Sequence, residues 1–190
     1  MDLRKAGSGN VGATNVGRVL GRRWGYLCFA LDTTKGFVPS FLAGLLIVGS
    51  GPPVPLQQAA WVGAGAGVIL GHVFNFWLGF HGGKGVAAAL GVVLGIYPYF
   101  TFAALAALGV WAVVTLVSRY VSLGSIVAAT AFLPLFAAFN GGRTRDLWPL
   151  GLFAAAMVAL LILRHRSNIR RLLAGTENKI GGRHSPPSAG

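Results

Sequence analysis

The sequence predicts an all-α integral membrane protein, a polytopic bundle of about six helical segments. Three observations predict it: composition, long apolar runs, and cations gathered on one side of those runs. Of 190 residues, 54% are hydrophobic and 11% charged, whereas a soluble globular domain carries about 25% charged residues. A formal charge of +12 would also suit nucleic acid. Runs without a single charge exclude a nucleic-acid-binding domain, so the lipid bilayer is the expected partner.

The apolar runs divide into six segments. Spanning the hydrocarbon takes about 20 apolar residues, and backbone in lipid must satisfy its own hydrogen bonds, so helices are expected. Because Pro98 breaks one long run, the piece before it is too short to span alone in the ordinary way. That piece is expected to be a half-helix or to extend back through a glycine loop. The segments are Trp24–Val48, Gln58–Leu78, Val86–Tyr97, Tyr99–Val117, Val121–Phe139 and Trp148–Leu163.

Glycines recur four residues apart in two of these segments. Gly63, Gly67 and Gly71 form one row, and Gly91 and Gly95 form another. In lipid this spacing lets neighbouring helix backbones approach closely. We expect both rows to be packing faces.

The charges predict the orientation. If each segment crosses once, thirteen of the sixteen Lys and Arg residues share the side of the N-terminus, two lie opposite, and Lys35 is within a span. Cations concentrate on the cytoplasmic side of membrane proteins, so the N-terminus is expected to be cytoplasmic. Residues 1–180 are expected to form one membrane-embedded domain. Residues 181–190, rich in Gly, Ser and Pro, are expected to be a disordered tail.

The same threading brings four polar clusters to the cytoplasmic face. They are Ser8–Arg18, His72–Gly85, Arg119–Ser125 and His165–Glu177. Four polar clusters that converge at one end of an apolar bundle indicate a site.

The first cluster is a glycine-rich loop. Gly7–Gly12 fits the dinucleotide fingerprint, with Asp32 twenty residues on, but only six residues precede it and no strand–helix–strand unit can be built. A glycine-rich segment leading into a helix still offers backbone N–H groups to an anion. The segment is dense in neutral hydrogen-bond donors and contains one arginine, whose planar guanidinium is a cationic donor. This density favours phosphate binding over a flexible loop with helix caps. The donors are Ser8, Asn10, Thr14, Asn15 and Arg18.

The second cluster joins His72 to Gly83-Lys84-Gly85. It is not a Walker A loop, since Gly85 replaces the Ser or Thr after the lysine. A lysine between glycines at a helix start is a candidate phosphate ligand. The alternative is an interfacial lysine that snorkels toward water.

The third cluster is Arg119 with Ser122 and Ser125. The two serines lie one helical turn apart, so both hydroxyls can face one ligand. The alternative is a helix N-cap.

In the fourth cluster His165 and Asn168 lie one turn apart, followed by Arg171 and Glu177. The alternative is a solvated basic tail on anionic lipid. Cys28 is alone and the four histidines lack ligand-like spacing, so no metal is expected.

These residues resemble the signature loops of the bacterial acyl-phosphate:glycerol-3-phosphate acyltransferases. The resemblance lies in Gly7–Asn15, Gly83–Gly85, Ser122–Ser125 and Arg164–Ile169, in order along nearly the whole chain. It implies a multi-span inner-membrane enzyme whose active site faces the cytoplasm. It also implies a further hydrophobic span ahead of Gly7, which would make seven.

The resemblance implies the reaction as well. An acyl group passes from acyl phosphate, not acyl-CoA or acyl carrier protein, to glycerol-3-phosphate. The products are 1-acyl-glycerol-3-phosphate (lysophosphatidic acid) and phosphate, in the first acylation step of phospholipid synthesis. No cofactor is implied, no nucleic acid is expected as a partner, and a monomer is expected to function.

The four clusters supply the expected site. Ser125, His165 and Asn168 are the candidate catalytic residues. The candidate substrate-binding residues are Ser8, Gly9, Asn10, Thr14, Asn15, Arg18, His72, Gly83, Lys84, Gly85, Arg119, Ser122, Arg171 and Glu177.

No histidine has an aspartate at the offset that many acyltransferases use, so we hypothesise a substrate-assisted route. Acyl phosphate is already activated, so the protein has mainly to position two anions and stabilise the oxyanion. A phosphate oxygen then accepts the hydroxyl proton, with His165 as the rival base.

Two other functions compete with the acyltransferase. A small anion transporter would also show several spans and cationic loops, but it should carry internal repeats and charges near the midplane. The halves of this chain show no repeat, and its charges gather at one face. A non-catalytic scaffold subunit would leave the converging donors unexplained.

Overall fold

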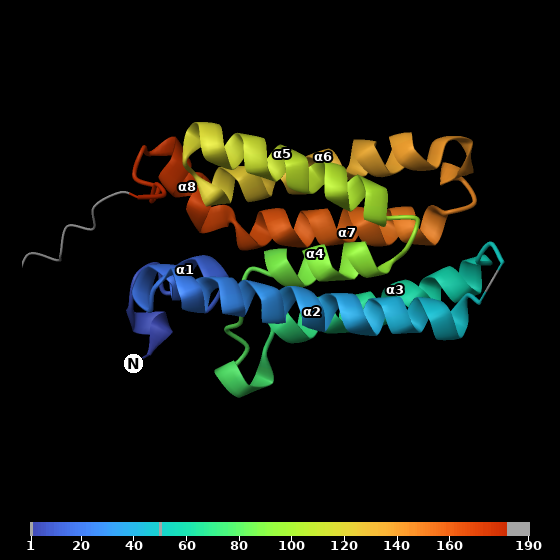
Figure 1. Cartoon of the computed structure of the whole chain (residues 1–190), viewed down its shortest axis with the longest axis horizontal. Helices are drawn as coiled ribbons and strands as arrows, with labels where there is room; N and C mark the ends of the chain where they lie inside the picture. Colours follow the sequence, from blue (N-terminus) through green and yellow to red (C-terminus); the bar gives the residue numbers. More distant parts are fainter. Residues whose placement is uncertain (1, 50, 182–190) are drawn as a thin grey trace, which may run out of the picture.

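The computed structural model describes residues 2–49 and 51–181, which are helices and loops with no strand among them. Six helices run beside one another along the long axis of the molecule (Figure 1). They are α2 (Arg22–Ile47), α3 (Pro55–Val73), α4 (Val86–Gly95), α5 (Thr101–Ser118), α6 (Val121–Asn140) and α7 (Trp148–Arg164). The short elements are η1 (Leu3–Lys5), α1 (Ala13–Val19), η2 (Phe76–Leu78), η3 (Gly141–Thr144) and α8 (Arg166–Leu173).

The predicted all-α membrane architecture is confirmed, and each of the six segments corresponds to one of these long helices. Among the described residues, three stretches are long and apolar enough to cross a bilayer: Pro55–Leu78, Thr101–Ser118 and Val121–Thr144. Helix α7 makes a fourth if it is counted with α8, which bends away from it by 55°. Helix α2 is long enough but carries four charged residues.

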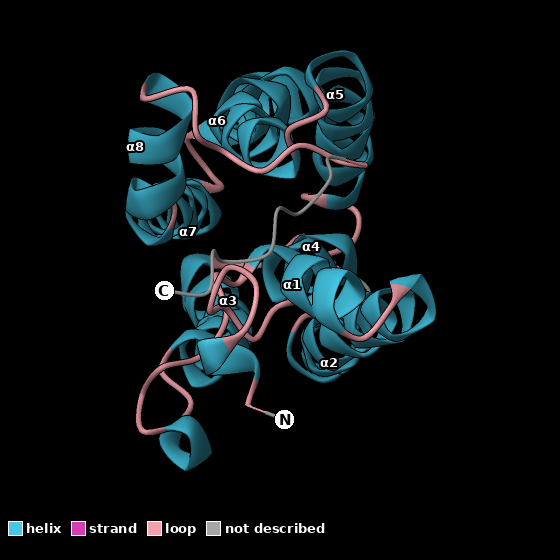
Figure 2. Cartoon of the chain, turned by 90° about the vertical axis from the view of Figure 1, so that its left-hand side faces the viewer, coloured by secondary structure: helices cyan, strands magenta, loops and turns pink. Residues whose placement is uncertain are grey.

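Helix α4 is short, as predicted, and lies near the centre of the bundle. Seen from one end, it has α2 and α3 on one side and α5, α6 and α7 on the other (Figure 2). A helix that is apolar all round belongs in a protein interior, and Ala88, Val92 and Gly91 are among its buried residues. Its first residue, Val86, therefore starts inside the bundle instead of at its rim.

The second predicted glycine row is confirmed as a packing face. A Cβ at Gly91 would stand 1.9 Å from the Thr33 carbonyl oxygen of α2, and one at Gly95 would stand 2.7 Å from that of Phe37. Gly36 of α2 makes the reciprocal contact, because a Cβ added there would stand 2.2 Å from the Ala88 carbonyl oxygen of α4. Only glycine allows α2 and α4 to approach this closely.

The first glycine row is a wrong prediction. Gly63, Gly67 and Gly71 have no atom of the described residues within 4 Å of a built Cβ. The contact face of α3 is instead the one carrying Gly65, whose Cβ would stand 2.6 Å from Val92. Spacing alone identified small residues but not the face that turns inward.

Aromatic packing closes the bundle between α5, α6 and α7. Phe100 is fully buried. Its ring meets Phe132 and Phe136 edge to face at centroid distances of 5.3 and 5.1 Å, and stacks on Phe153 at 6.3 Å. Such pairs add about 0.5–1.5 kcal/mol each beyond area burial. They fix α5–α7 as one unit.

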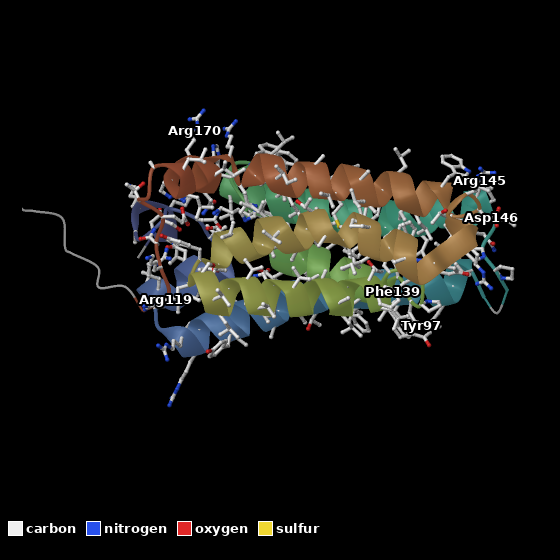
Figure 3. All side chains as sticks on the ribbon, turned by 90° about the horizontal axis from the view of Figure 1, so that it is seen from above. Tyr97, Arg119, Phe139, Arg145, Asp146 and Arg170 are labelled. Atoms are coloured by element: carbon white, nitrogen blue, oxygen red, sulfur yellow. The ribbon has the colours of Figure 1, made fainter. Side chains whose placement is uncertain are left out.

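The bundle has two ends that differ in chemistry. We call the polar end the one that carries α1, the loop 81–85, the α5–α6 turn at Arg119 and the α8 region through residue 181 (Figure 1). The opposite end carries the α2–α3, α4–α5 and α6–α7 connections. Figure 3 shows Arg119 and Arg170 at the first end, and Arg145 and Asp146 at the second. All four predicted clusters reach the polar end, so the candidate site lies there.

Candidate functional site

Two of the predicted clusters meet on the Glu177 carboxylate. Ser122 Oγ donates to Oε1 at 3.1 Å, and Asn168 Nδ2 donates to the same oxygen at 2.8 Å. Arg171 Nε donates to Oε2 at 2.8 Å. The Glu177 side chain is only 7% exposed, and a buried carboxylate is tolerated when it is paired and hydrogen-bonded in this way. The contacts tie α6 to α8 and to the segment that follows it.

Arg119 holds that C-terminal segment instead of facing the Glu177 network. Its Nη2 donates to the Ile180 carbonyl at 2.8 Å, and the Ile180 N–H donates to the Arg119 carbonyl at 2.8 Å. Lys179 lies over the Tyr120 ring at 5.4 Å. The structure therefore gives this candidate substrate ligand a packing role, which the sequence did not predict.

Lys84 links the loop before α4 to α8. Its Nζ donates to Asn168 Oδ1, so the direct partner of the ammonium is a neutral amide. Among the described residues no carboxylate lies within ion-pair distance of it. Burial lowers the pKa of Lys84 to about 8; the Glu177 charge opposes this shift, and Arg171 and Arg18 add to it. A cation held by an amide remains available to an anionic ligand.

The two glycines before Lys84 are pinned from both sides. The Gly82 N–H donates to the Val73 carbonyl at 3.1 Å. Arg164 Nη2 donates to the carbonyls of Gly82 and Gly83, at 3.3 Å each. A Cβ at Gly83 would stand 2.2 Å from His72 Nε2. The sequence did not assign Arg164 this role, although Arg164 begins the last stretch of the family resemblance, Arg164–Ile169.

His72 is paired inside the bundle with residues of α2. Its Nδ1 lies 2.7 Å from Lys35 Nζ and 3.6 Å from Asp32 Oδ1, and Lys35 Nζ donates to Asp32 Oδ1 at 2.6 Å. From the sequence, Asp32 was considered in the rejected dinucleotide fingerprint and Lys35 as a cation within a span. Two ionisable residues one turn apart within a span were the signal available.

Asn15 ties the first glycine loop together. It is 2% exposed. Its Oδ1 accepts the Ser8 N–H at 2.8 Å, and its Nδ2 donates to the carbonyls of Leu3, Ala6 and Asn10. Both protons of its amide nitrogen are therefore used inside the loop. Asn15 therefore shapes the loop, whereas the sequence predicted that it binds substrate.

Other side chains of the loop keep their donors free. Among the described residues, the hydroxyls of Ser8 and Thr14 make no hydrogen bond, whereas Asn10 Oδ1 accepts the Gly12 N–H at 2.9 Å. Gly9 adopts φ = +69°, a left-handed conformation that favours glycine. The fold places Ser8 and Thr14 at the polar end with unused donors.

Arg18 extends this loop toward the other clusters. It lies in the last turn of α1. Burial lowers its pKa, and the charges of Glu177 and Arg171 act on it. Arg18 therefore lies in the same electrostatic environment as Lys84, and the first cluster joins the others.

His165 and Ser125 stand between the polar network and the bundle interior. His165 is 3% exposed, and its Nδ1 lies 2.7 Å from the Leu161 carbonyl. Because a carbonyl oxygen only accepts, Nδ1 carries a proton and the neutral ring presents Nε2 as an acceptor. Ser125 Oγ donates to the Val121 carbonyl at 2.9 Å.

An apolar groove begins at Ser125 and continues among the helices. Its walls come mostly from α4, α5, α6 and α7, including Val93, Ala107, Phe132 and Met157. One end of the groove is thus next to a hydroxyl of the polar end and the rest is hydrocarbon. This shape suits a ligand with a polar head and an apolar tail.

Known proteins are similar to this chain in sequence and in fold. The family model described as glycerol-3-phosphate acyltransferase matches residues 1–175. Over 95% of the chain, 47% of residues are identical to the glycerol-3-phosphate acyltransferase of Trichlorobacter lovleyi and 45% to that of Aquifex aeolicus, covering 84% and 86% of those proteins.

A solved structure agrees with these matches. PlsY (YgiH), an integral membrane glycerol 3-phosphate acyltransferase, was solved in a glycerol 3-phosphate form. It is 41% identical, with a TM-score of 0.82 over 95% of this chain and 83% of that one. Its lysophosphatidic acid form gives a TM-score of 0.78, over 92% of this chain and 81% of that one.

Proposed function

Because this chain belongs to the glycerol-3-phosphate acyltransferase family, we propose that its polar end transfers an acyl group from acyl phosphate to glycerol-3-phosphate. The chain is an integral membrane glycerol-3-phosphate acyltransferase of phospholipid synthesis. The proposal adds the donor and the residues that act on it.

One observation carries the proposal: at the polar end three cations are set against a single carboxylate. Arg171 bonds to Glu177 and Lys84 bonds to Asn168, which also bonds to Glu177. The Glu177 charge acts on both Lys84 and Arg18, and Glu177 is the only acidic residue of the four clusters. Both proposed substrates carry phosphate, and phosphate oxygens accept charge-assisted hydrogen bonds from such groups. The apolar groove beside Ser125 then takes the acyl chain.

The chemical step needs positioning more than a strong base. The C1 hydroxyl oxygen of glycerol-3-phosphate attacks the acyl carbonyl carbon, and the bond from that carbon to the phosphate oxygen breaks. A phosphate oxygen takes the hydroxyl proton, so phosphate leaves with it and lysophosphatidic acid remains. Holding two reactants in line can supply several kcal/mol of the barrier. His165 Nε2 is the rival acceptor for that proton.

Groups from all four clusters bind the phosphates or fix the groups that do. Lys84, Arg18 and Arg171 supply side-chain donors, and Asn168 and Glu177 hold Lys84 and Arg171 in place. Ser122 fixes Glu177, to which its hydroxyl donates. The first glycine loop adds Ser8 and Thr14, whose hydroxyls have no partner among the described residues. The backbone of Gly9, Gly83 and Gly85 lies where such groups can approach an anion.

We infer a bacterial inner membrane from the family, and the cation distribution supports an orientation with the polar end in the cytoplasm. Among the described residues, Arg143 and Arg145 are the cations of the opposite end. Cations are retained on the cytoplasmic side. Function as a monomer stays a prediction.

The donor is tested with purified protein and labelled glycerol-3-phosphate. Acyl phosphate should give lysophosphatidic acid and an equal amount of phosphate, whereas acyl-CoA should give little or none, because a thioester lacks the phosphate that the cations hold. Omitting glycerol-3-phosphate is the control for donor hydrolysis. Comparable rates with both donors would exclude the substrate-assisted step and direct attention to His165 as base.

A further inference from the structure

Asp32, Lys35 and His72 form an ionisable cluster that the proposed reaction does not use. Lys35 lies thirteen residues after Arg22, the first residue of α2, which is about 20 Å along a helix. His72 is the penultimate residue of α3. Charged side chains are costly at membrane depth and persist there when they pair and serve a function. Because the three side chains pair with one another, their function depends on the groups that they contact outside the cluster.

The cluster touches the loop that carries Lys84. The Nε2 side of the His72 ring fills the space above Gly83, where a Cβ would stand 2.2 Å from Nε2. The Nδ1 side of the same ring faces Lys35 at 2.7 Å. The imidazole thus stands between α2 and the loop, and Lys35, itself bound to Asp32 at 2.6 Å, fixes where the ring lies.

The loop is held from the other side by α7. Arg164 Nη2 donates to the Gly82 and Gly83 carbonyls. The position of α2 relative to α4 is set by the close contact of Gly36 with Ala88, in the first turn of α4. The loop between His72 and α4 therefore has little freedom, and Lys84 leaves it directly after Gly83.

We propose that Asp32, Lys35 and His72 are positioning residues that clamp the Gly82–Gly83 backbone against Arg164 and so set where Lys84 presents its ammonium group to a substrate phosphate. The inference rests on the proposed role of Lys84. Asp32 orients Lys35, Lys35 orients the His72 ring, and the ring limits the loop. None of the three contacts the substrate.

Kinetics of single variants distinguish positioning from a general contribution to stability. The first set is Lys84→Ala, His72→Ala and Lys35→Met, with Thr34→Ala as a control at a neighbouring exposed position of the same helix. His72→Ala and Lys35→Met should raise KM about tenfold for the same substrate whose KM rises in Lys84→Ala, with kcat changed much less. Lys35→Arg, which keeps a cation beside Asp32, should restore most of the lost affinity, and Thr34→Ala should leave both constants unchanged.

A paired substitution tests the contact itself. Gly83→Ala adds a methyl group where the His72 ring lies, so it should displace the loop and lose most activity. His72→Ala removes the ring, so Gly83→Ala with His72→Ala should be about tenfold more active than Gly83→Ala alone. A double variant no better than Gly83→Ala would overturn the clamp. So would wild-type KM values for both substrates in Lys35→Met, a test that stands even where His72 variants fail to fold.

The two proposals fail differently. If Lys84→Ala has wild-type constants, the phosphate role of Lys84 is wrong and the positioning role falls with it. If Lys84→Ala is impaired while Lys35→Met keeps wild-type KM values and the double variant is no better than Gly83→Ala, only the positioning role is wrong. Shift of the melting temperature by glycerol-3-phosphate gives a readout of binding that does not depend on turnover.

Discussion

The polar end and the opposite end of the bundle differ in how their polar side chains are satisfied. The opposite end has a cavity of about 650 Å³, lined by Gln58, Trp61, Arg143 and Asp146 among others. Its buried donors go to backbone: Gln58 Nε2 to the carbonyls of Pro53 and Asp146, and Trp61 Nε1 to that of Ser40. The first two bonds hold loops against α3, and the third joins α3 to α2.

At the polar end the side chains bond to one another across elements. Lys84 reaches Asn168, Asn168 reaches Glu177, and Glu177 also accepts from Ser122 and Arg171. A network of charges costs more to bury than backbone capping does. We therefore propose that the substrates bind at the converging charged side chains and not in the larger cavity.

The largest expected effect separates two cations, one from each end. Lys84→Ala should lower kcat/KM about 100-fold, because a charge-assisted bond to phosphate is worth about 1.5–3 kcal/mol and positioning of the reacting carbon is lost with it. Arg143→Ala, beside the larger cavity, should change it less than about twofold. Kinetics of the two purified variants check this. An equal loss in both would remove the distinction between the ends.

A smaller effect separates two asparagines that each donate to a residue outside their own helix. Asn168→Ala should lower kcat/KM about 30-fold, because Lys84 and Glu177 both lose a partner. Asn140 at the opposite end donates to the Tyr99 and Phe136 carbonyls. Asn140→Ala should lower the melting temperature and leave the kinetic constants near wild type. Unchanged kinetics in Asn168→Ala would contradict the assignment of the network to the site.

The smallest effect is on pH dependence and belongs to the polar end alone. Burial lowers the pKa of Lys84 to about 8. Since phosphate binding needs the protonated amine, kcat/KM should be full below pH 8 and should fall about tenfold by about pH 9. Lys84→Arg keeps its charge throughout this range, so its profile should stay flat there. A wild-type profile as flat as that of the variant would show that deprotonation of Lys84 does not cause the fall in kcat/KM.

Hydropathy and charge predicted the fold well because both are local properties of the chain. The six segments match α2–α7, and Pro98 correctly placed the end of α4 near Tyr97. The four polar clusters also reach one end as predicted, because each pair of successive helices returns the chain to the same end of the bundle.

The rest depended on tertiary contacts that spacing does not encode. Which glycine row of α3 turns inward depends on where Val92 lies, and Gly65 was not singled out. Asn15 and Arg119 have polar side chains typical of ligands, but the fold engages both with nearby backbone. The pairing of Lys35 with His72 joins residues of two helices, so it could not be read from either segment.

A crystal structure of this chain with glycerol-3-phosphate tests the central claim most directly. Density for the phosphate should lie at the polar end, within hydrogen-bond distance of Lys84 Nζ and among donors of the first glycine loop. Density in the larger cavity of the opposite end, beside Gln58 and Arg143, would contradict the account.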